Sequence, residues 1–163
     1  MTAVPGPASP GPAAPGPADP GPASTASGPG RVLVAIYGVF ALAATARAGY
    51  QLLAKFDEAP LAYLLSALAA AVYIVATVAL ARDRRGAAWV AVGVELVGVL
   101  AVGTLSVLDT GDFPDETVWS VYGQGYGYVP LVLPFLGVAW LWHTRPGARA
   151  AAEGSRSQAP ADQ

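Results

Sequence analysis

The chain has 163 residues, of which 54% are hydrophobic and only 12% charged, and its formal net charge is −2. Soluble domains carry about 25% charged residues, so this composition places the chain in the membrane class. The slightly negative charge argues against a nucleic-acid partner. The absence of cysteine excludes disulfides and thiolate metal sites, and the single histidine, His143, argues against a histidine-based metal site. We therefore expect no cofactor and no metal centre.

Residues 1–30 form a low-complexity segment. The unit Pro-Gly-Pro-Ala begins at Pro5, Pro10, Pro15 and Pro20. Its glycines recur every five residues, not every three, which excludes collagen. Because proline removes backbone donors and glycine raises the entropy cost of ordering, we expect a disordered tail with polyproline II character. The Pro-x-x-Pro spacings would also fit an aromatic groove, but a free tail is the favoured interpretation.

Four apolar segments follow, each about as long as a membrane-spanning helix: residues 32–53, 61–81, 87–108 and 118–142. We therefore predict an all-α membrane protein. Its transmembrane domain, residues 31–143, is a bundle of four helices. It lies between the disordered tail and a short polar tail, residues 144–163, which we also expect to be disordered.

The second and fourth segments carry local signals. The second begins after Pro60, which suits a first helical turn, and contains a ridge of small residues at four-residue spacing, which lets helices approach closely: Ala62, Ser66 and Ala70. The fourth segment is irregular, because glycine-rich residues 122–128 precede two prolines. A kinked helix and a non-helical outer third both fit this pattern. Gly123-x-x-x-Gly127 has the spacing of a close helix–helix contact, which we favour over a role in lining an outer vestibule.

The loop charges predict the orientation. Seven basic residues fall on one side of the four segments: Arg31, Arg82, Arg84, Arg85, Arg145, Arg149 and Arg156. Six acidic residues fall on the other: Asp57, Glu58, Asp109, Asp112, Asp115 and Glu116. The positive-inside rule then places both termini in the cytoplasm of a bacterial plasma membrane. Three tryptophans fall at the inner interface of this topology, Trp89, Trp140 and Trp142, and Trp119 falls at the outer interface.

Glu95 lies near the middle of the third segment. A carboxyl group at that depth normally faces a protein interior or a wet cavity. Tyr73 of the antiparallel second segment falls at about the same depth, which makes its hydroxyl the predicted hydrogen-bond partner. Arg47 lies roughly 8–10 Å further out, and we expect it to snorkel toward Asp57, Glu58 or lipid phosphate. Glu95, Tyr73 and Arg47 form the candidate intramembrane polar site. The residues that flank Glu95 on its own helical face are mostly small, which favours packing against other helices: Ala88, Ala91, Gly98 and Val102.

Two interpretations of Glu95 remain open. It is a proton or cation site, or it is a carboxyl group that hydrogen-bonds across helices and stabilises their packing. The second is favoured, because no other acid, histidine or lysine shares its depth. Any ligand is then better sought at the outer rim, where Gln51, Gln124 and Tyr126 join Arg47 in a candidate outer vestibule.

The sequence offers no catalytic residues. The acidic loop 109–116 has the oxygen ligands that divalent cations prefer, but its spacing is not that of an EF-hand, and an acidic outer loop is what topology alone selects. Ser66 and Ser106 have no histidine positioned to activate them. We therefore predict neither a metal site nor an enzyme.

Two runs, KFDEAPLAYLLSA (residues 55–67) and VELVGVLAVGTLS (residues 94–106), resemble segments of small, generally uncharacterised four-helix integral membrane proteins of actinobacteria. The resemblance covers about residues 31–145 and implies a plasma-membrane protein without catalytic residues. We expect a non-enzymatic accessory or interaction protein in the lipid bilayer, which assembles as a homo-oligomer or with a partner membrane protein. The alternative is a small proton- or cation-coupled transporter that uses Glu95.

Overall fold

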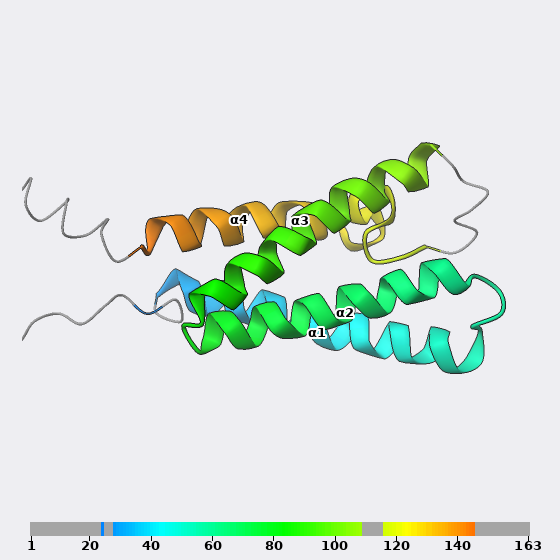
Figure 1. Cartoon of the computed structure of the whole chain (residues 1–163), viewed down its shortest axis with the longest axis horizontal. Coiled ribbons are helices and arrows are strands. Elements are labelled where there is room, and N and C mark those ends of the chain that lie inside the picture. The colour runs from blue at the N-terminus through cyan, green and yellow to red at the C-terminus, as the bar shows by residue number, and fades with distance from the viewer. Residues whose placement is uncertain (1–23, 25–27, 109–115, 146–163) are drawn as a thin grey trace, which may run out of the picture.

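The computed structural model describes residue 24 and residues 28–108 and 116–145. The described part is helical and contains no β-strand. In chain order its elements are α1 (Pro29–Ala54), α2 (Pro60–Ala81), α3 (Arg85–Leu108), the 3₁₀ helix η1 (Ser120–Tyr126) and α4 (Val129–His143) (Figure 1). The predicted helical class is confirmed for these residues, whereas both predicted tails lie almost wholly outside them.

Three of the helices are long and apolar enough to cross a membrane. α1, α2 and α3 have 26, 22 and 24 residues, and an 18-residue stretch within each has a mean hydropathy of 1.7, 2.3 and 2.1, respectively. At ~1.5 Å per residue even α2 is about 33 Å long, which exceeds the ~30 Å hydrocarbon core. Their ends lie within three residues of the predicted boundaries.

The fourth apolar segment is not one continuous helix over residues 118–142. It is broken into η1 and α4, whose axes are bent by 101°. α4 has 15 residues, or about 22 Å, so it does not span the hydrocarbon core alone. The bent pair together makes a fourth candidate span. Neither alternative that the sequence left open describes it fully: the outer part is not α-helical, but a short 3₁₀ helix interrupted by residues with left-handed backbone angles.

Backbone conformation explains the break. Val121 and Tyr122 have φ of 47° and 58°, and Gly123 and Gly127 have φ of 80° and 65°. A Cβ atom on Gly123 would lie 2.7 Å from the ring of Pro130. These two glycines therefore permit a tight, partly left-handed turn, and the interpretation of their spacing as a helix-packing motif is wrong.

The helices form one body (Figure 1). α1 and α2 make an antiparallel hairpin with the most extensive contact. α3 runs obliquely and packs against α2 and α4, and η1 lies at the start of α4. The start of α1 and the end of α4 lie at the same end of the body. As predicted, the small-residue ridge of α2 is buried: Ala62, Ser66 and Ala70.

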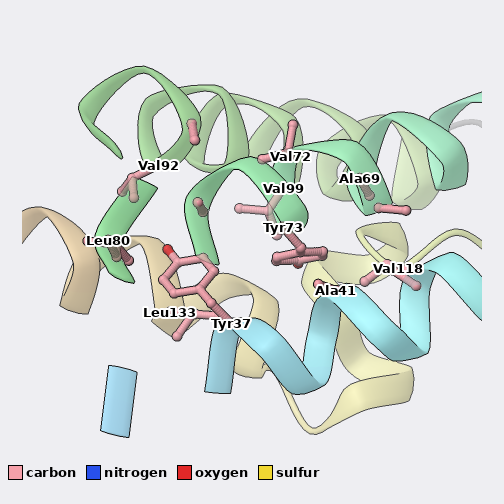
Figure 2. Packing of buried hydrophobic residues seen from close by; sticks show 14 of the residues in the cluster. Tyr37, Ala41, Ala69, Val72, Tyr73, Leu80, Val92, Val99, Val118 and Leu133 are labelled. Atoms are coloured by element: carbon pink, nitrogen blue, oxygen red, sulfur yellow. The ribbon is translucent and has the colours of Figure 1, made fainter. Parts of the chain in front are cut away.

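The main core is made of alanines, valines, leucines, two tyrosines and Trp119. Figure 2 shows Tyr37 of α1 and Tyr73 of α2 directed into the space between the helices, beside Val92 and Val99 of α3 and Leu133 of α4. Both tyrosine side chains are fully buried. The hydrophobic interior therefore has polar groups at its centre.

Trp119 lies in the core, whereas Trp89 and Trp142 lie against Arg145 at one end of the body. Trp119, which the sequence placed at the outer interface, is only 1% exposed and belongs to the core. At the end where α4 stops, the guanidinium of Arg145 lies 3.9 Å from the ring centroid of Trp142 and 5.5 Å from that of Trp89. Trp119 is buried because its indole ring lies directly against α3 at Gly98.

Arg85 ties the first turn of α3 to the last turn of α4. Its guanidinium donates to the backbone carbonyl of Leu141 at 3.4 Å and to that of Thr144. A helix leaves its last carbonyls without intrahelical partners and carries partial negative charge there. Arg85 satisfies both requirements from a neighbouring helix.

Candidate functional site

Glu95 is the only acidic residue inside α3, and its side chain is 0% exposed. Its Oε2 atom accepts a 2.7 Å hydrogen bond from the hydroxyl of Tyr37. Tyr37 comes from α1, so this bond joins the first and third helices. α1 and α3 make almost no other contact, because each packs mainly on α2 or α4.

Tyr37 was not identified from the sequence as a partner of Glu95, although the two residues fall at nearly the same depth. It is the ninth residue of α1 and Glu95 is the eleventh of α3, and both helices begin at the same end of the body. With ~1.5 Å per residue the two residues differ by only about 3 Å in depth. The signal was present, but the sequence does not say which helix lies opposite the carboxyl group.

Tyr73, the predicted partner, lies beside the site. Its ring centroid is 6.3 Å from that of Tyr37, and its hydroxyl interacts electrostatically with the Glu95 carboxyl group. The Tyr73 hydroxyl accepts a 3.3 Å hydrogen bond from Nε1 of Trp119. Tyr73 interacts with the Glu95 carboxyl group as predicted, but the 2.7 Å hydrogen bond to Oε2 comes from Tyr37, which the sequence did not predict. Oε1 of Glu95 accepts no close hydrogen bond from the described residues.

Two glycines let these aromatic groups approach. A Cβ atom on Gly98 would lie 2.6 Å from the ring of Trp119. A Cβ atom on Gly137 would lie 3.0 Å from the Tyr37 hydroxyl oxygen. Gly98 was predicted as a helix-packing position, and what packs there is the Trp119 side chain.

The electrostatic character of the Glu95 site is that of a single carboxyl group without a counter-charge. No described lysine, arginine or histidine forms an ion pair with Glu95. The described ranges also contain no group of three histidine, aspartate or glutamate side chains that would suit a metal ion. The carboxyl group can exchange a proton or accept hydrogen bonds.

Arg47 belongs to a separate site, toward the end of the body where α1 and α2 are joined. Its Nη1 atom donates to the Tyr126 hydroxyl at 3.2 Å, and Nη2 donates to the backbone carbonyl of Glu116. The expected approach to Asp57 or Glu58 does not occur. The segment that leads into η1 folds back over α1 and presents oxygen acceptors at the depth of Arg47, while Glu58 pairs with Lys55 at 2.9 Å.

The four predicted vestibule residues do not line one opening. Arg47 and Tyr126 are joined, and Tyr126 also packs on Phe40 with ring centroids 6.0 Å apart. Gln51 is 5% exposed and its Oε1 atom lacks a partner among the described residues. Gln124 is exposed on η1. The prediction of a shared vestibule is therefore wrong for the two glutamines, because one faces the core and the other faces away from it.

Comparisons with known protein families, with curated proteins and with solved structures found no match. Function therefore has to follow from the chain's own side chains, since a helical fold by itself is compatible with many roles.

Proposed function

We propose that the protein is a non-enzymatic integral membrane protein of the bacterial plasma membrane, an accessory or interaction component in which Glu95 has a structural role. The observation that carries this proposal is the hydrogen bond from Tyr37 to the fully buried Glu95. It connects two helices that otherwise hardly touch. A polar contact across apolar helices favours one helix arrangement over others, because separating it leaves two unsatisfied groups.

The proposed topology has four spans and both termini in the cytoplasm. The three long helices support it, as does the bent pair of η1 and α4. Five of the six described arginines also lie at the end where α4 stops, and Arg47 is the exception. A test uses the natural absence of cysteine. In intact cells an impermeant maleimide is expected to label Asp57→Cys and not Ser9→Cys. The reverse pattern would invert the topology.

The proposed partners are the lipid bilayer and another membrane protein or a second copy of this chain. An apolar groove of about 450 Å³ between α1 and α2, which includes Gly38 and Ala35, offers a close approach to another helix. Crosslinking in native membranes followed by mass spectrometry distinguishes a second copy from a different protein.

A second candidate function has its own supporting observation. Oε1 of Glu95 is buried without a hydrogen-bond partner, and a carboxylate without a counter-charge in an apolar interior is costly. A group in that position holds a proton or a cation, as in a small proton- or cation-coupled transporter. Glu95 would then be the coupling residue.

Glu95→Gln separates the two functions. The amide retains the side-chain volume and an oxygen that accepts from Tyr37, but it no longer titrates. If Glu95 is structural, the full-length protein carries no proton flux above that of empty proteoliposomes, and Glu95→Gln unfolds at nearly the wild-type temperature while Glu95→Leu unfolds earlier. If Glu95 is a coupling residue, the wild-type protein carries a flux that Glu95→Gln abolishes while it remains folded.

A further inference from the structure

The surface where α2 ends and α3 begins carries an apolar groove with a volume of about 270 Å³. Its walls are the membrane-facing side of the last turns of α2 and the start of α3. The residues that line it are Ile74, Val75, Val78, Ala79, Arg84 and Ala87. Three of these are exposed apolar side chains, at 44%, 48% and 39% for Ile74, Val75 and Val78.

Arg84 is the one charged residue in this lining. Its side chain is exposed, and it forms no ion pair with any residue of the described segments. Arg85, the next residue, is not available in the same way, because its guanidinium donates hydrogen bonds to the carbonyls at the end of α4. Arg84 therefore presents a guanidinium without an ion-pair partner among the described residues at one end of an apolar groove.

The groove and the guanidinium together match an anionic amphiphile. A guanidinium recognises phosphate oxygens through two parallel hydrogen bonds, and apolar helix surface at membrane depth takes an acyl chain. Arg84 follows the end of α2, which the proposed topology places near the level of the lipid phosphates. Basic pockets between transmembrane helices are suited to anionic head groups for the same reason.

We propose that this groove holds one anionic phospholipid, with its phosphate on Arg84 and one acyl chain along Ile74, Val75 and Val78. The site is independent of the proposed roles of Glu95, since it lies on the surface and at another depth. The bound phospholipid comes from the membrane leaflet that surrounds the α2–α3 turn.

Binding of phosphatidylglycerol and of phosphatidylcholine with the same acyl chains to the full-length protein in micelles tests the proposal, with native mass spectrometry as the readout. Arg84→Gln is expected to weaken phosphatidylglycerol binding by at least about tenfold. The matched control is Arg82→Gln, which removes the same charge from the same turn outside the groove. This control is expected to lower the affinity for phosphatidylglycerol by no more than roughly fivefold, which is the contribution of one charge near an anionic surface.

The acyl-chain position has a separate variant. Val78→Trp fills the groove without touching Arg84 and is expected to weaken phosphatidylglycerol binding, whereas Val90→Trp, at an exposed position of α3 outside the groove, is not. Equal losses for Arg84→Gln and Arg82→Gln would overturn the proposal in favour of diffuse charge attraction. Equal binding of the two lipids, or undiminished binding to Val78→Trp, would overturn it as well. Circular dichroism confirms that each variant is folded.

Discussion

The Tyr37 hydroxyl donates a 2.7 Å hydrogen bond to the Glu95 carboxyl group, 58 residues further along the chain. Both side chains are fully buried, and the bond crosses between α1 and α3 at mid-depth. It is a direct polar link between the first and third helices, and the stability of the helix arrangement is expected to depend on it.

Tyr37→Phe removes this donor and leaves Oε2 of Glu95 without its partner. The free energy of unfolding is expected to fall by about 1–2 kcal/mol, measured by denaturant-induced unfolding in micelles. Tyr50→Phe is the matched control, since Tyr50 lies on the same helix and is 61% exposed. It is expected to stay within about 0.5 kcal/mol of wild type. Indistinguishable stabilities for the two variants would rule out a structural role for the bond.

Gly98→Ala tests the close approach of Trp119 to α3. The added Cβ atom would lie 2.6 Å from the indole ring, so the ring has to move, and a loss of about 1–3 kcal/mol is expected. Gly93→Ala on the same helix meets nothing within 4 Å and is expected to be neutral or stabilising by up to about 1 kcal/mol. Thermal unfolding gives both values, and near-UV circular dichroism reports the indole environment. A stable Gly98→Ala variant with an unchanged spectrum would contradict the described packing.

Arg47→Gln removes the charged guanidinium whose hydrogen bonds hold the segment around η1 against α1. Charge-assisted hydrogen bonds contribute about 1.5–3 kcal/mol, so local opening becomes more frequent. Hydrogen exchange of the amides of residues 120–126 is expected to accelerate by about tenfold or more, measured by mass spectrometry of that peptide. Lys55→Gln, which breaks an exposed pair at the same end of the body, is the control and leaves this exchange unchanged. An unchanged rate in Arg47→Gln would show that η1 is held by its packing alone.

Lys55 provides a pH-dependent observable in the turn between α1 and α2. Its hydrogen bond to Glu58 and the charge of that carboxylate raise the pKa of Lys55 above its ordinary value. Because the pKa of Lys55 is higher in the folded state than in the unfolded state, the pair stabilises the fold fully at pH values below the unfolded-state pKa. This contribution is lost as the pH rises through the folded-state pKa of Lys55. The chain has no other lysine, so a ¹³C or ¹⁵N NMR titration reads this group alone. Glu58→Gln is expected to lower the pKa of Lys55, and an unchanged titration would show that the pair does not persist in solution.

The spans could be predicted from sequence because length and apolarity are local properties. Within a bilayer every backbone donor and acceptor of a single segment must be paired inside that segment. An apolar run of about 20 residues therefore forms an α-helix. α1, α2 and α3 therefore begin and end close to their predicted positions. The small-residue ridge of α2 was predictable for a similar reason, since a four-residue repeat places its members on one helical face.

The candidate site was predictable only in part. Depth along a helix follows from residue count, and it correctly brought Tyr73 near Glu95 and kept Arg47 away from it. It does not reveal the lateral order of the helices, which is why Tyr37 was overlooked and why Gln51 and Gln124 were wrongly grouped.

The sequence by itself determined that this chain is helical, that it contains apolar segments of membrane-spanning length and that one carboxyl group lies near the middle of one of them. Only the tertiary structure decided that this carboxyl group meets Tyr37, that Trp119 turns into the core and that the fourth segment breaks at its glycines. The physical reason is that hydrophobic length acts within one segment, whereas the partner of a buried polar group depends on how separate segments pack against one another.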